Sequence, residues 1–281
     1  MTLETRMMRH GAALNDDKRD AGLMTPGDVK RVDDIKYGPA RENVLDVYYP
    51  KNGNEPYPVI ISVHGGGWVY GDKERYQYYC MDLAKRGFAV VNFTYRLAPE
   101  SKYPAQMEDV VSVFEWVFEK AGEYKFDLGN LFAVGDSAGA HLLSLYCAKY
   151  AEKGRLPKAV ALNCGVYDME AAFKANRSMK DLMKDLLPGK GTAEEIAEIN
   201  PLNFIKENFP PCFVMTATDD FLKPQAPLLT TKLDSLGVSY KYKLYSDEET
   251  PLGHVFHLDI RSRSGKLCND EECEFFKGFI N

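Results

Sequence analysis

The sequence has 281 residues, of which 45% are hydrophobic and 27% are charged, the composition of an ordinary globular protein. Its net charge of -6 and the lack of a basic cluster argue against a nucleic-acid partner. No run approaches the roughly 18 apolar residues of a membrane span, and the N-terminal segment lacks the apolar core of a secretory signal. We therefore expect a cytoplasmic protein with no membrane partner.

The cysteine pattern supports the same expectation. Six cysteines are scattered along the chain, none of them in a C-x-x-C pair: Cys80, Cys147, Cys164, Cys212, Cys268 and Cys273. Most lie in apolar surroundings, which favours buried, reduced thiols. Cys268 and Cys273 are close in sequence but have no histidine beside them, so we predict no zinc site and no other metal site.

Strands and helices are predicted to alternate along most of the chain. A polar segment, residues 1–28, comes first, and helical turns are expected within it. Residues 29–37 and 43–49 then alternate as two strands of an edge hairpin. Further strands are predicted at 58–63, 88–93, 131–134, 159–162, 212–217 and 240–245. Helices are predicted at 73–86, from Pro104 onward, and at 140–153, 224–236 and 271–280.

This alternation predicts an α/β fold, in which a mostly parallel sheet is covered by helices on both faces. The pattern lapses only at residues 165–208, a mixed-charge insertion with helices expected at 169–175, 179–187 and 193–199. No linker, internal repeat or low-complexity tract divides the chain. We therefore predict a single domain, residues 1–281, with an N-terminal extension at about 1–28 and an insertion at about 165–208.

One pentapeptide carries the first chemical signal, and it reads Gly135-Asp136-Ser137-Ala138-Gly139. It lies between a predicted strand and a predicted helix, which is the context of a nucleophile elbow. On such a sharp turn the neighbouring backbones lie close together, so the positions that flank the serine require glycine. The motif predicts that the Ser137 hydroxyl stands clear of the sheet. The alternative is a glycine-rich turn with an incidental serine.

Acyl transfer through a serine needs a base, an anion that orients the base, and donors for the oxyanion. In a doubly wound sheet these groups meet at the carboxyl ends of strands, in the chain order serine, acid, histidine. Of the five histidines, His254 follows the last strand in a loop and is the predicted base, with His257 as the fallback. We expect His10 to be solvated and His141 to pack or form hydrogen bonds.

The acid is expected after the strand at 212–217, where Asp219 and Asp220 stand side by side. We favour Asp220, which directly precedes Phe221. The alternative role for either carboxylate is an N-cap on the following helix. Asp168, after the preceding strand, is a weaker candidate for the acid and is expected to fix its own loop.

A glycine-rich turn, His64-Gly65-Gly66-Gly67, ends the strand at 58–63. Its bare amides, together with the amide of Ala138, are predicted to form an oxyanion hole. The competing interpretation is a phosphate cradle. Because neither G-x-G-x-x-G nor a P-loop is present, we expect no nucleotide and no other cofactor.

Together these motifs resemble the α/β-hydrolase fold, and within it the hormone-sensitive-lipase-like group of carboxylesterases. The matching segments follow the family's order from about Asp46 onward: His64 to Trp68, Tyr95 to Glu100, Gly135 to Gly139, Asp220 to Leu222 and His254 to Phe256. The acid motif reads Asp-Phe-Leu, where many members have Asp-Pro-Leu.

The resemblance implies a role for each matching position. Ser137 would be the nucleophile, His254 the general base and then acid, and Asp220 its orienter. The oxyanion hole would consist of the amides of Gly66, Gly67 and Ala138. Residues 95–100 would stabilise loops without doing chemistry, and a small helical cap over the site would come from residues 1–28 and 165–208. The expected partner is a small-molecule ester, and the sequence leaves a homodimer open.

Three functions are compatible with these motifs. Hydrolysis of short-chain carboxylic esters through an acyl-enzyme on Ser137 is the leading hypothesis. Removal of acetyl or feruloyl groups from carbohydrate is an alternative, because aromatic residues near the glycine-rich turn offer stacking surfaces: Trp68, Tyr70, Tyr76, Tyr78 and Tyr79. Packing against the cap explains the same residues. A non-catalytic ligand receptor on the same fold is disfavoured, because serine, acid and histidine are all present.

Overall fold

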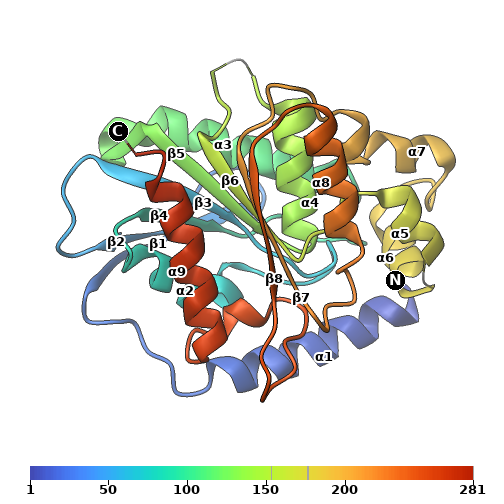
Figure 1. The fold of residues 1–281 in the computed structure, drawn as a ribbon, viewed down its shortest axis with the longest axis horizontal. Helices are drawn as coiled ribbons and strands as arrows, with labels where there is room; N and C mark the ends of the chain where they lie inside the picture. The colour runs from blue at the N-terminus through green and yellow to red at the C-terminus, as the bar shows by residue number, and fades with distance from the viewer. Residues whose placement is uncertain (153, 176, 281) are drawn as a thin grey trace.

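The computed structural model describes residues 1–152, 154–175 and 177–280, and an eight-stranded sheet lies at its centre (Figure 1). The strands are β1 (Val29–Lys36), β2 (Val44–Pro50), β3 (Tyr57–Val63), β4 (Ala89–Phe93), β5 (Phe126–Asp136), β6 (Ala159–Asn163), β7 (Cys212–Ala217) and β8 (Tyr240–Tyr245). Their order across the sheet is β1-β2-β4-β3-β5-β6-β7-β8.

The sheet is antiparallel at one edge and parallel elsewhere. β1 and β2 pair antiparallel, as predicted for an edge hairpin, and β2 also runs antiparallel to β4. From β4 across to β8 all neighbours are parallel. Parallel strands end at the same edge of the sheet, so the loops after β3, β5, β7 and β8 converge there. The predicted mostly parallel sheet is confirmed.

Helices cover both faces of the sheet. One face carries α3 (Ala105–Tyr124), α4 (Ala138–Leu145) and α8 (Gln225–Ser235), and the other carries α2 (Lys73–Ala84) and α9 (Arg263–Lys277). Side chains of β3 alternate between the two cores, with Ile61 and Val63 in the first and Ile60 in the second. Burial on both sides explains why the central strands read as continuous apolar runs.

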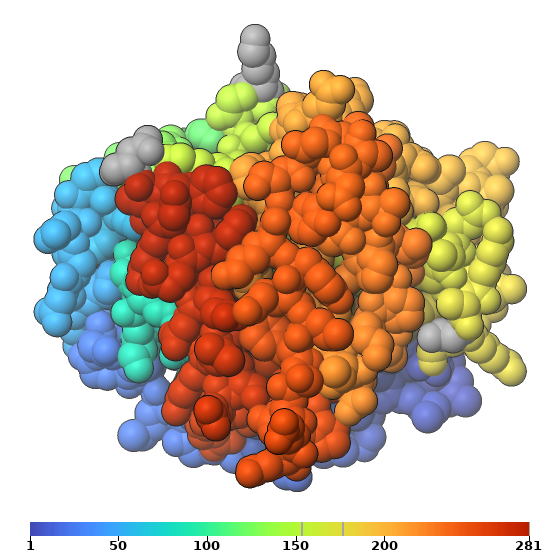
Figure 2. Space-filling model, in the orientation of Figure 1, coloured from blue at the N-terminus to red at the C-terminus, as the bar shows by residue number. Residues whose placement is uncertain are grey.

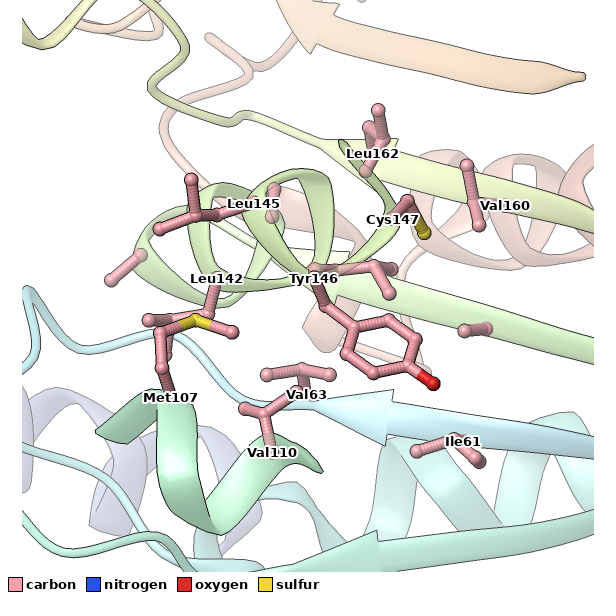
Figure 3. Close-up of a cluster of buried hydrophobic side chains, with 14 of the residues drawn as sticks. Ile61, Val63, Met107, Val110, Leu142, Leu145, Tyr146, Cys147, Val160 and Leu162 are labelled. Atoms are coloured by element: carbon pink, nitrogen blue, oxygen red, sulfur yellow. The ribbon is translucent and has the colours of Figure 1, made fainter. Parts of the chain in front are cut away.

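The core beneath α3 and α4 fixes the position of the elbow helix. Figure 3 shows Met107 and Val110 of α3 facing Val63 of β3 and Leu142 of α4. Tyr146, at the end of α4, stacks on Phe114 with ring centroids 3.9 Å apart. Helix α4 is thus anchored on its inner side by buried side chains, which leaves its N-terminus directed to the strand-end loops.

The N-terminal segment forms one long helix, α1 (Leu3–Asp20), where only helical turns were expected. The Thr2 hydroxyl caps it. Its polar residues are satisfied by distant segments of the chain: Arg9 donates hydrogen bonds to the carbonyls of Val69 and Ala98. These tertiary contacts hold the helix in place. The sequence of residues 3–20 has no apolar periodicity from which the helix could have been predicted. In Figures 1 and 2 α1 runs along the lower rim of the molecule.

Residues 165–208 are largely helical, as predicted, and comprise α5 (Met169–Ala175), α6 (Arg177–Leu186) and α7 (Ala193–Glu198). Asn176, which falls within this range, lies outside the described residues. Helix α6 packs against α1. The Asp185 carboxylate accepts a hydrogen bond from the Thr2 amide at 2.7 Å, and Ser178 donates one to Glu4 at 2.6 Å. Two segments that are far apart in sequence therefore lie side by side.

Some predicted boundaries differ from the observed ones. Helix α4 ends at Leu145 and continues as a single π-helical turn, Tyr146–Tyr150, while Lys153, its predicted end, lies outside the described residues. The last helix begins at Arg263 and not near residue 271, because the Ser262 hydroxyl caps it by accepting from the Gly265 amide.

Two further predictions concern the molecule as a whole. The six cysteines are buried and free, as expected. Among the described residues, no helix has the combined length and apolar character that crossing a bilayer demands.

Candidate active site

The turn between β5 and α4 has the strained backbone of a nucleophile elbow. β5 ends at Asp136, Ser137 adopts φ 54° and ψ −116°, and α4 begins at Ala138. A Cβ atom on Gly139 would lie 2.0 Å from the Val63 carbonyl oxygen, and one on Gly135 would lie 2.6 Å from the Gly139 carbonyl oxygen. Only glycine fits at either place. The flanking glycines of the motif are therefore required by contact between backbones.

The three side chains expected to act together form one hydrogen-bonded chain. His254 Nε2 lies 2.9 Å from Ser137 Oγ, and His254 Nδ1 lies 2.7 Å from Asp220 Oδ1. They come from the loops after β8, β5 and β7, at the sheet edge where those loops converge. With Nδ1 donating to the carboxylate, Nε2 is left free to accept the serine proton, which is the arrangement that activates a serine.

Asp220 is held as an anion by its surroundings. Burial alone would raise its pKa, but the hydrogen bond and charge of His254 and donors from Leu222 and Thr216 outweigh that effect and lower the pKa below its usual range. The Leu222 amide donates to Oδ1 at 2.9 Å, and the Thr216 hydroxyl donates to Oδ2 at 2.8 Å. Thr216 was not singled out from the sequence, although it lies on the strand that carries the acid.

The other two candidate acids occupy different positions. Asp219 is exposed, and its amide donates to the Leu252 carbonyl. Asp168 accepts a hydrogen bond from the Ala171 amide at 2.9 Å and so fixes the start of α5, as expected. Asp220 is thus the carboxylate that the structure brings to His254.

The glycine-rich turn lies directly against the elbow. A Cβ on Gly65 would come 3.3 Å from Ser137 Cβ, which places this turn beside the serine. Gly66 and Gly67 have φ values of 114° and 58°, and a Cβ on Gly66 would lie 2.0 Å from the Tyr70 carbonyl oxygen. Within the described ranges, the amides of Gly66 and Gly67 donate to no protein acceptor outside their own turn. They are available to a ligand, as is the Ala138 amide in the first turn of α4.

Residues that flank the glycine-rich turn hold it in place. The His64 ring stacks on Tyr95 at 3.9 Å, and the Tyr95 hydroxyl donates to the His64 carbonyl at 3.1 Å. The Tyr76 hydroxyl accepts from the Gly65 amide at 2.9 Å. Burial lowers the pKa of His64 to about 4, so its ring is neutral at neutral pH. The segment that begins at Tyr95 thus supports the turn, in agreement with the role that the resemblance implies.

The remaining histidines serve other roles. His141 is buried, accepts from the Trp68 indole at 3.1 Å and bonds to the Ile199 carbonyl at 2.7 Å, as its predicted hydrogen-bonding role requires. Burial lowers its pKa to about 4. His10 is exposed, as expected. His257, the fallback base, is completely buried and contacts Asp136 in place of the serine.

A cavity of about 440 Å³ opens above Ser137. Met8 and Ala12 of α1 line it, as do Met179 and Leu182 of α6. Its other lining residues include Trp68, Tyr70, Val166, Phe221, Leu222 and Val255. The wall is therefore mostly apolar near the serine. Both segments predicted to form a cap, residues 1–28 and 165–208, therefore contribute to that wall.

Most of the aromatic residues near the glycine-rich turn are buried. Trp68 is 1% exposed, Tyr79 2% and Tyr76 6%, so their rings pack inside the protein. Tyr70 lines the cavity and donates from its hydroxyl to Asp16 at 2.8 Å, and Tyr78 donates to the Leu23 carbonyl. Packing and internal hydrogen bonds therefore account for four of the five, but Tyr76 and Tyr79 pack in the core beside α9 and not against the predicted cap.

One set of side chains in the described part of the chain has the composition of a metal site. Potential ligand atoms of Cys164, Asp220 and His254 lie within 4.8 Å of one another. Asp220 and His254 already bond to each other with those atoms, and burial raises the pKa of the Cys164 thiol well above its usual value. Since a thiol binds metals as the thiolate, this geometry favours the hydrogen-bonded chain.

Several known proteins that resemble this chain are esterases. Residues 45–233 match the protein-family model BD-FAE. The versiconal hemiacetal acetate esterase of Dothistroma septosporum is 29% identical over 244 residues, which cover 79% of this chain and 71% of that protein. Esterase LipQ of Mycobacterium tuberculosis is 28% identical over 232 residues, and the match covers 74% of this chain but only 55% of LipQ.

Solved structures agree with this result. The crystal structure of esterase B from Lactobacillus rhamnosis superposes with a TM-score of 0.88 at 28% sequence identity, covering 98% of this chain and 94% of that one. Another crystal structure of esterase B is of the enzyme inhibited by a C4-C4 tributyrin phosphonate.

The sheet, the elbow and the esterase relatives define an α/β-hydrolase that hydrolyses carboxylic esters, which is the predicted fold and class. More narrowly, this chain belongs to the BD-FAE family and to the hormone-sensitive-lipase-like carboxylesterases.

Proposed function

We propose that this protein hydrolyses short-chain carboxylic esters through an acyl-enzyme formed on Ser137. The observation that carries the proposal is the chain of two hydrogen bonds, 2.9 Å and 2.7 Å long, that links Ser137 through His254 to Asp220. His254 is the general base and then the general acid. Asp220 holds the ring in the tautomer that has Nε2 free and stabilises the imidazolium that forms.

The chemistry proceeds in two halves. Ser137 Oγ bonds to the ester carbonyl carbon as its proton passes to His254 Nε2, and the carbonyl oxygen becomes an oxyanion. The amides of Gly66, Gly67 and Ala138 stabilise that charge. The bond to the alcohol oxygen then breaks, and the alcohol leaves with the proton from His254. Water attacks the acyl group in the same way, and Ser137 is released with its proton restored.

The enclosure of the site favours small acyl groups. The cavity of about 440 Å³ is walled by α1 and α6, whose Met8 and Leu182 side chains approach the glycine-rich turn. We propose that residues 1–28 and 165–208 act as a cap on one catalytic domain and that this cap sets the acyl length. Crystal structures of the similar esterase B are described as inhibited by a C4-C4 tributyrin phosphonate and as C6-C4 inhibited, which supports a substrate with short chains.

Replacing the nucleophile tests the proposal. Ser137→Ala should lower turnover of p-nitrophenyl acetate by at least about 10⁴-fold, because the attacking oxygen is gone while the binding site remains. Ser144→Ala is the matched control, because Ser144 lies about two helical turns further along α4. This variant should keep its activity. Activity of Ser137→Ala near the wild-type level would refute the assignment.

Deacylation of carbohydrate is the second candidate. Tyr70 in the cavity wall is the single observation in its favour, since it is the cavity-lining tyrosine whose ring is only half-buried. A series of p-nitrophenyl esters of increasing acyl length, run beside acetylated and feruloylated xylan, separates the two. Faster release of acetate or ferulate from xylan than from the simple esters would favour the carbohydrate.

A non-catalytic receptor is the candidate of another class. A fluorophosphonate reacts with a serine only where a base activates it, so mass spectrometry of the Ser137 peptide discriminates directly. Labelling at Ser137 is expected. An unlabelled, folded protein would favour the receptor.

Two further features belong to the proposal. Six free, buried cysteines support a reducing compartment such as the cytoplasm. β8 is an edge strand on which Tyr242 and Leu244 are 39% and 49% exposed, which supports a homodimer formed along this edge. Light scattering during size-exclusion chromatography would give the mass and test the dimer.

A further inference from the structure

A buried histidine–carboxylate pair joins the two loops that carry Ser137 and His254. His257 Nε2 lies 2.9 Å from Asp136 Oδ1, and these residues are 0% and 1% exposed. Asp136 directly precedes Ser137, and His257 follows His254 by three residues. The pair and the serine–histidine bond therefore connect the same two segments.

Both of those segments have strained backbones. Ser137 has φ 54°, and Val255, next to His254, has φ 51° and ψ 34°. A positive φ is uncommon outside glycine, and for a β-branched residue such as valine it is a strained outlier. Such conformations persist only where surrounding contacts impose them. The Asp136–His257 bond lies where it can impose both.

Residues of helix α9 support the Asp136–His257 pair. Glu272, also fully buried, accepts from Asn163 Nδ2 at 2.6 Å and from the Tyr79 hydroxyl at 3.0 Å. The Asn163 carbonyl in turn accepts from the Ser137 amide at 2.8 Å. This second route reaches the Ser137 backbone through the end of β6.

The same helix holds the His257 backbone. Asn269 Nδ2 donates to the His257 carbonyl at 3.3 Å and to Asp82 at 3.2 Å. The Tyr79 ring packs edge-on against the His257 ring, with centroids 5.2 Å apart. The side chain and the main chain of His257 are thus both fixed.

Stability alone does not account for this cluster. Removing ionisable groups from water costs free energy that their attraction seldom fully returns, and apolar side chains of the same volume are often more stabilising. A displacement of about 1 Å at a reacting group, by contrast, costs about 10²-fold in rate. The benefit of the cluster is therefore expected in geometry.

We propose that His257 and Asp136 are positioning residues, which hold His254 and Ser137 in register for proton transfer. The inference rests on the proposed function of Ser137 and His254. Glu272 and Asn269 support the pair from α9.

Two substitutions at His257 test the inference. His257→Phe fills the space but removes the donor, whereas His257→Gln keeps an N–H that reaches Asp136. With p-nitrophenyl acetate, His257→Phe should lower kcat by about 10- to 100-fold while KM stays within about threefold of wild type. His257→Gln should recover kcat to within about fivefold, and the rate of fluorophosphonate labelling of Ser137 should follow kcat. The exposed His10→Gln is the matched control and should behave as wild type.

The outcomes separate cleanly. A folded His257→Phe protein with wild-type kcat, or equal losses in the Phe and Gln variants, overturns the inference. If circular dichroism shows that His257→Phe does not fold, Asp136→Ala decides. It removes the acceptor of the bond from His257, and it should lower kcat about tenfold at unchanged KM, so a wild-type kcat overturns the inference. Wild-type protein that neither turns over esters nor labels at Ser137 contradicts the proposed function instead.

Discussion

At the scale of single residues, surroundings distinguish side chains that the sequence makes equivalent. Asp219 and Asp220 are adjacent and chemically identical. Asp220 is 4% exposed and accepts hydrogen bonds from His254, Leu222 and Thr216, whereas Asp219 is exposed and lacks these partners. Only the buried carboxylate can stabilise an imidazolium, because its charge is unscreened by water.

Neutralising each aspartate in turn exposes that difference. Asp220→Asn should lower kcat by about 10³- to 10⁴-fold, because the amide favours the wrong tautomer of His254 and cannot stabilise its charge. Asp219→Asn, the matched control, should keep kcat within about threefold. Steady-state kinetics with p-nitrophenyl acetate measures both, and the reverse ranking would move the acid to Asp219.

At the scale of elements, the elbow depends on how closely α4 approaches the end of β3. Gly139 lies in the first turn of α4, where a Cβ would be 2.0 Å from the Val63 carbonyl oxygen and 2.6 Å from the His64 carbonyl oxygen. Both obstacles are backbone atoms, so neither can rotate away.

Two glycine-to-alanine changes in helices should therefore have opposite signs. Gly139→Ala should destabilise the protein by about 3 kcal/mol or more, because the backbone must move to admit the methyl group. Gly122→Ala in α3, where no atom lies within 4 Å of the new Cβ, should stabilise it by about 0.5–1 kcal/mol. Urea denaturation measures both, and a stable Gly139→Ala protein would contradict the observed packing.

Helix α1 is a second element whose placement matters for the site. Met8 and Ala12 on its inner side line the cavity, and the neighbouring Arg9 fixes the helix to the carbonyls of Val69 and Ala98 and to Glu100. Arg9 is 29% exposed, so its bonds are only partly screened by water.

Removing that attachment should loosen the cavity wall. Arg9→Gln is expected to cost about 1–2 kcal/mol of stability and to raise KM several-fold for short esters while kcat changes little. The reason is that Ser137 and His254 remain in place while Met8 loses its fixed position. The exposed Arg6→Gln on the same helix is the control. If a thermal-shift assay shows that Arg9→Gln is folded and its KM is unchanged, α1 does not shape the pocket.

At the scale of the whole molecule, buried ionisable groups give stability an uneven dependence on pH. Burial lowers the pKa of His64 and His141 to about 4, so the unfolded chain binds more protons between pH 4 and 6.5 and stability rises with pH there. Burial raises the pKa of Glu272 to about 7, so the contribution of this carboxyl makes stability fall as pH rises. That contribution is complete below about pH 4.5 and is lost as pH rises through about 7.

Removing the Glu272 charge should therefore steepen the rise of stability with pH. Relative to wild type, Glu272→Gln should gain about 3 kcal/mol between pH 4.5 and 7.5, in addition to any pH-independent offset. The ionisable groups near Glu272 include Asp136 and His257 at the elbow, Tyr79 on α2, and Cys268 and Cys273 on its own helix. The exposed Glu274→Gln on α9 should run parallel to wild type. Parallel curves for Glu272→Gln as well would mean that this carboxyl keeps an ordinary pKa.

The sequence by itself determined the fold class and the order of the reacting groups. Apolar and alternating runs are local properties, and they placed seven of the eight strands within one residue of their observed bounds. The exception is β5, which begins at Phe126 and not at the predicted residue 131. Motif order predicted that Ser137, Asp220 and His254 would meet, because parallel strands deliver their carboxyl-end loops to one edge. Glycines at 66, 135 and 139 were readable for a similar reason, since their need arises from backbone contact.

Only the tertiary structure decided what surrounds those residues. The polar sequence of α1 gives no sign that Arg9 has partners about 60 and 90 residues away. Nothing local marks His257, Asp136 and Glu272 as one buried cluster, because they come from a loop, a strand and the last helix. Burial and pairing are properties of the assembled fold, so the pKa values that follow from them and the cavity above Ser137 exist only once distant segments have packed together.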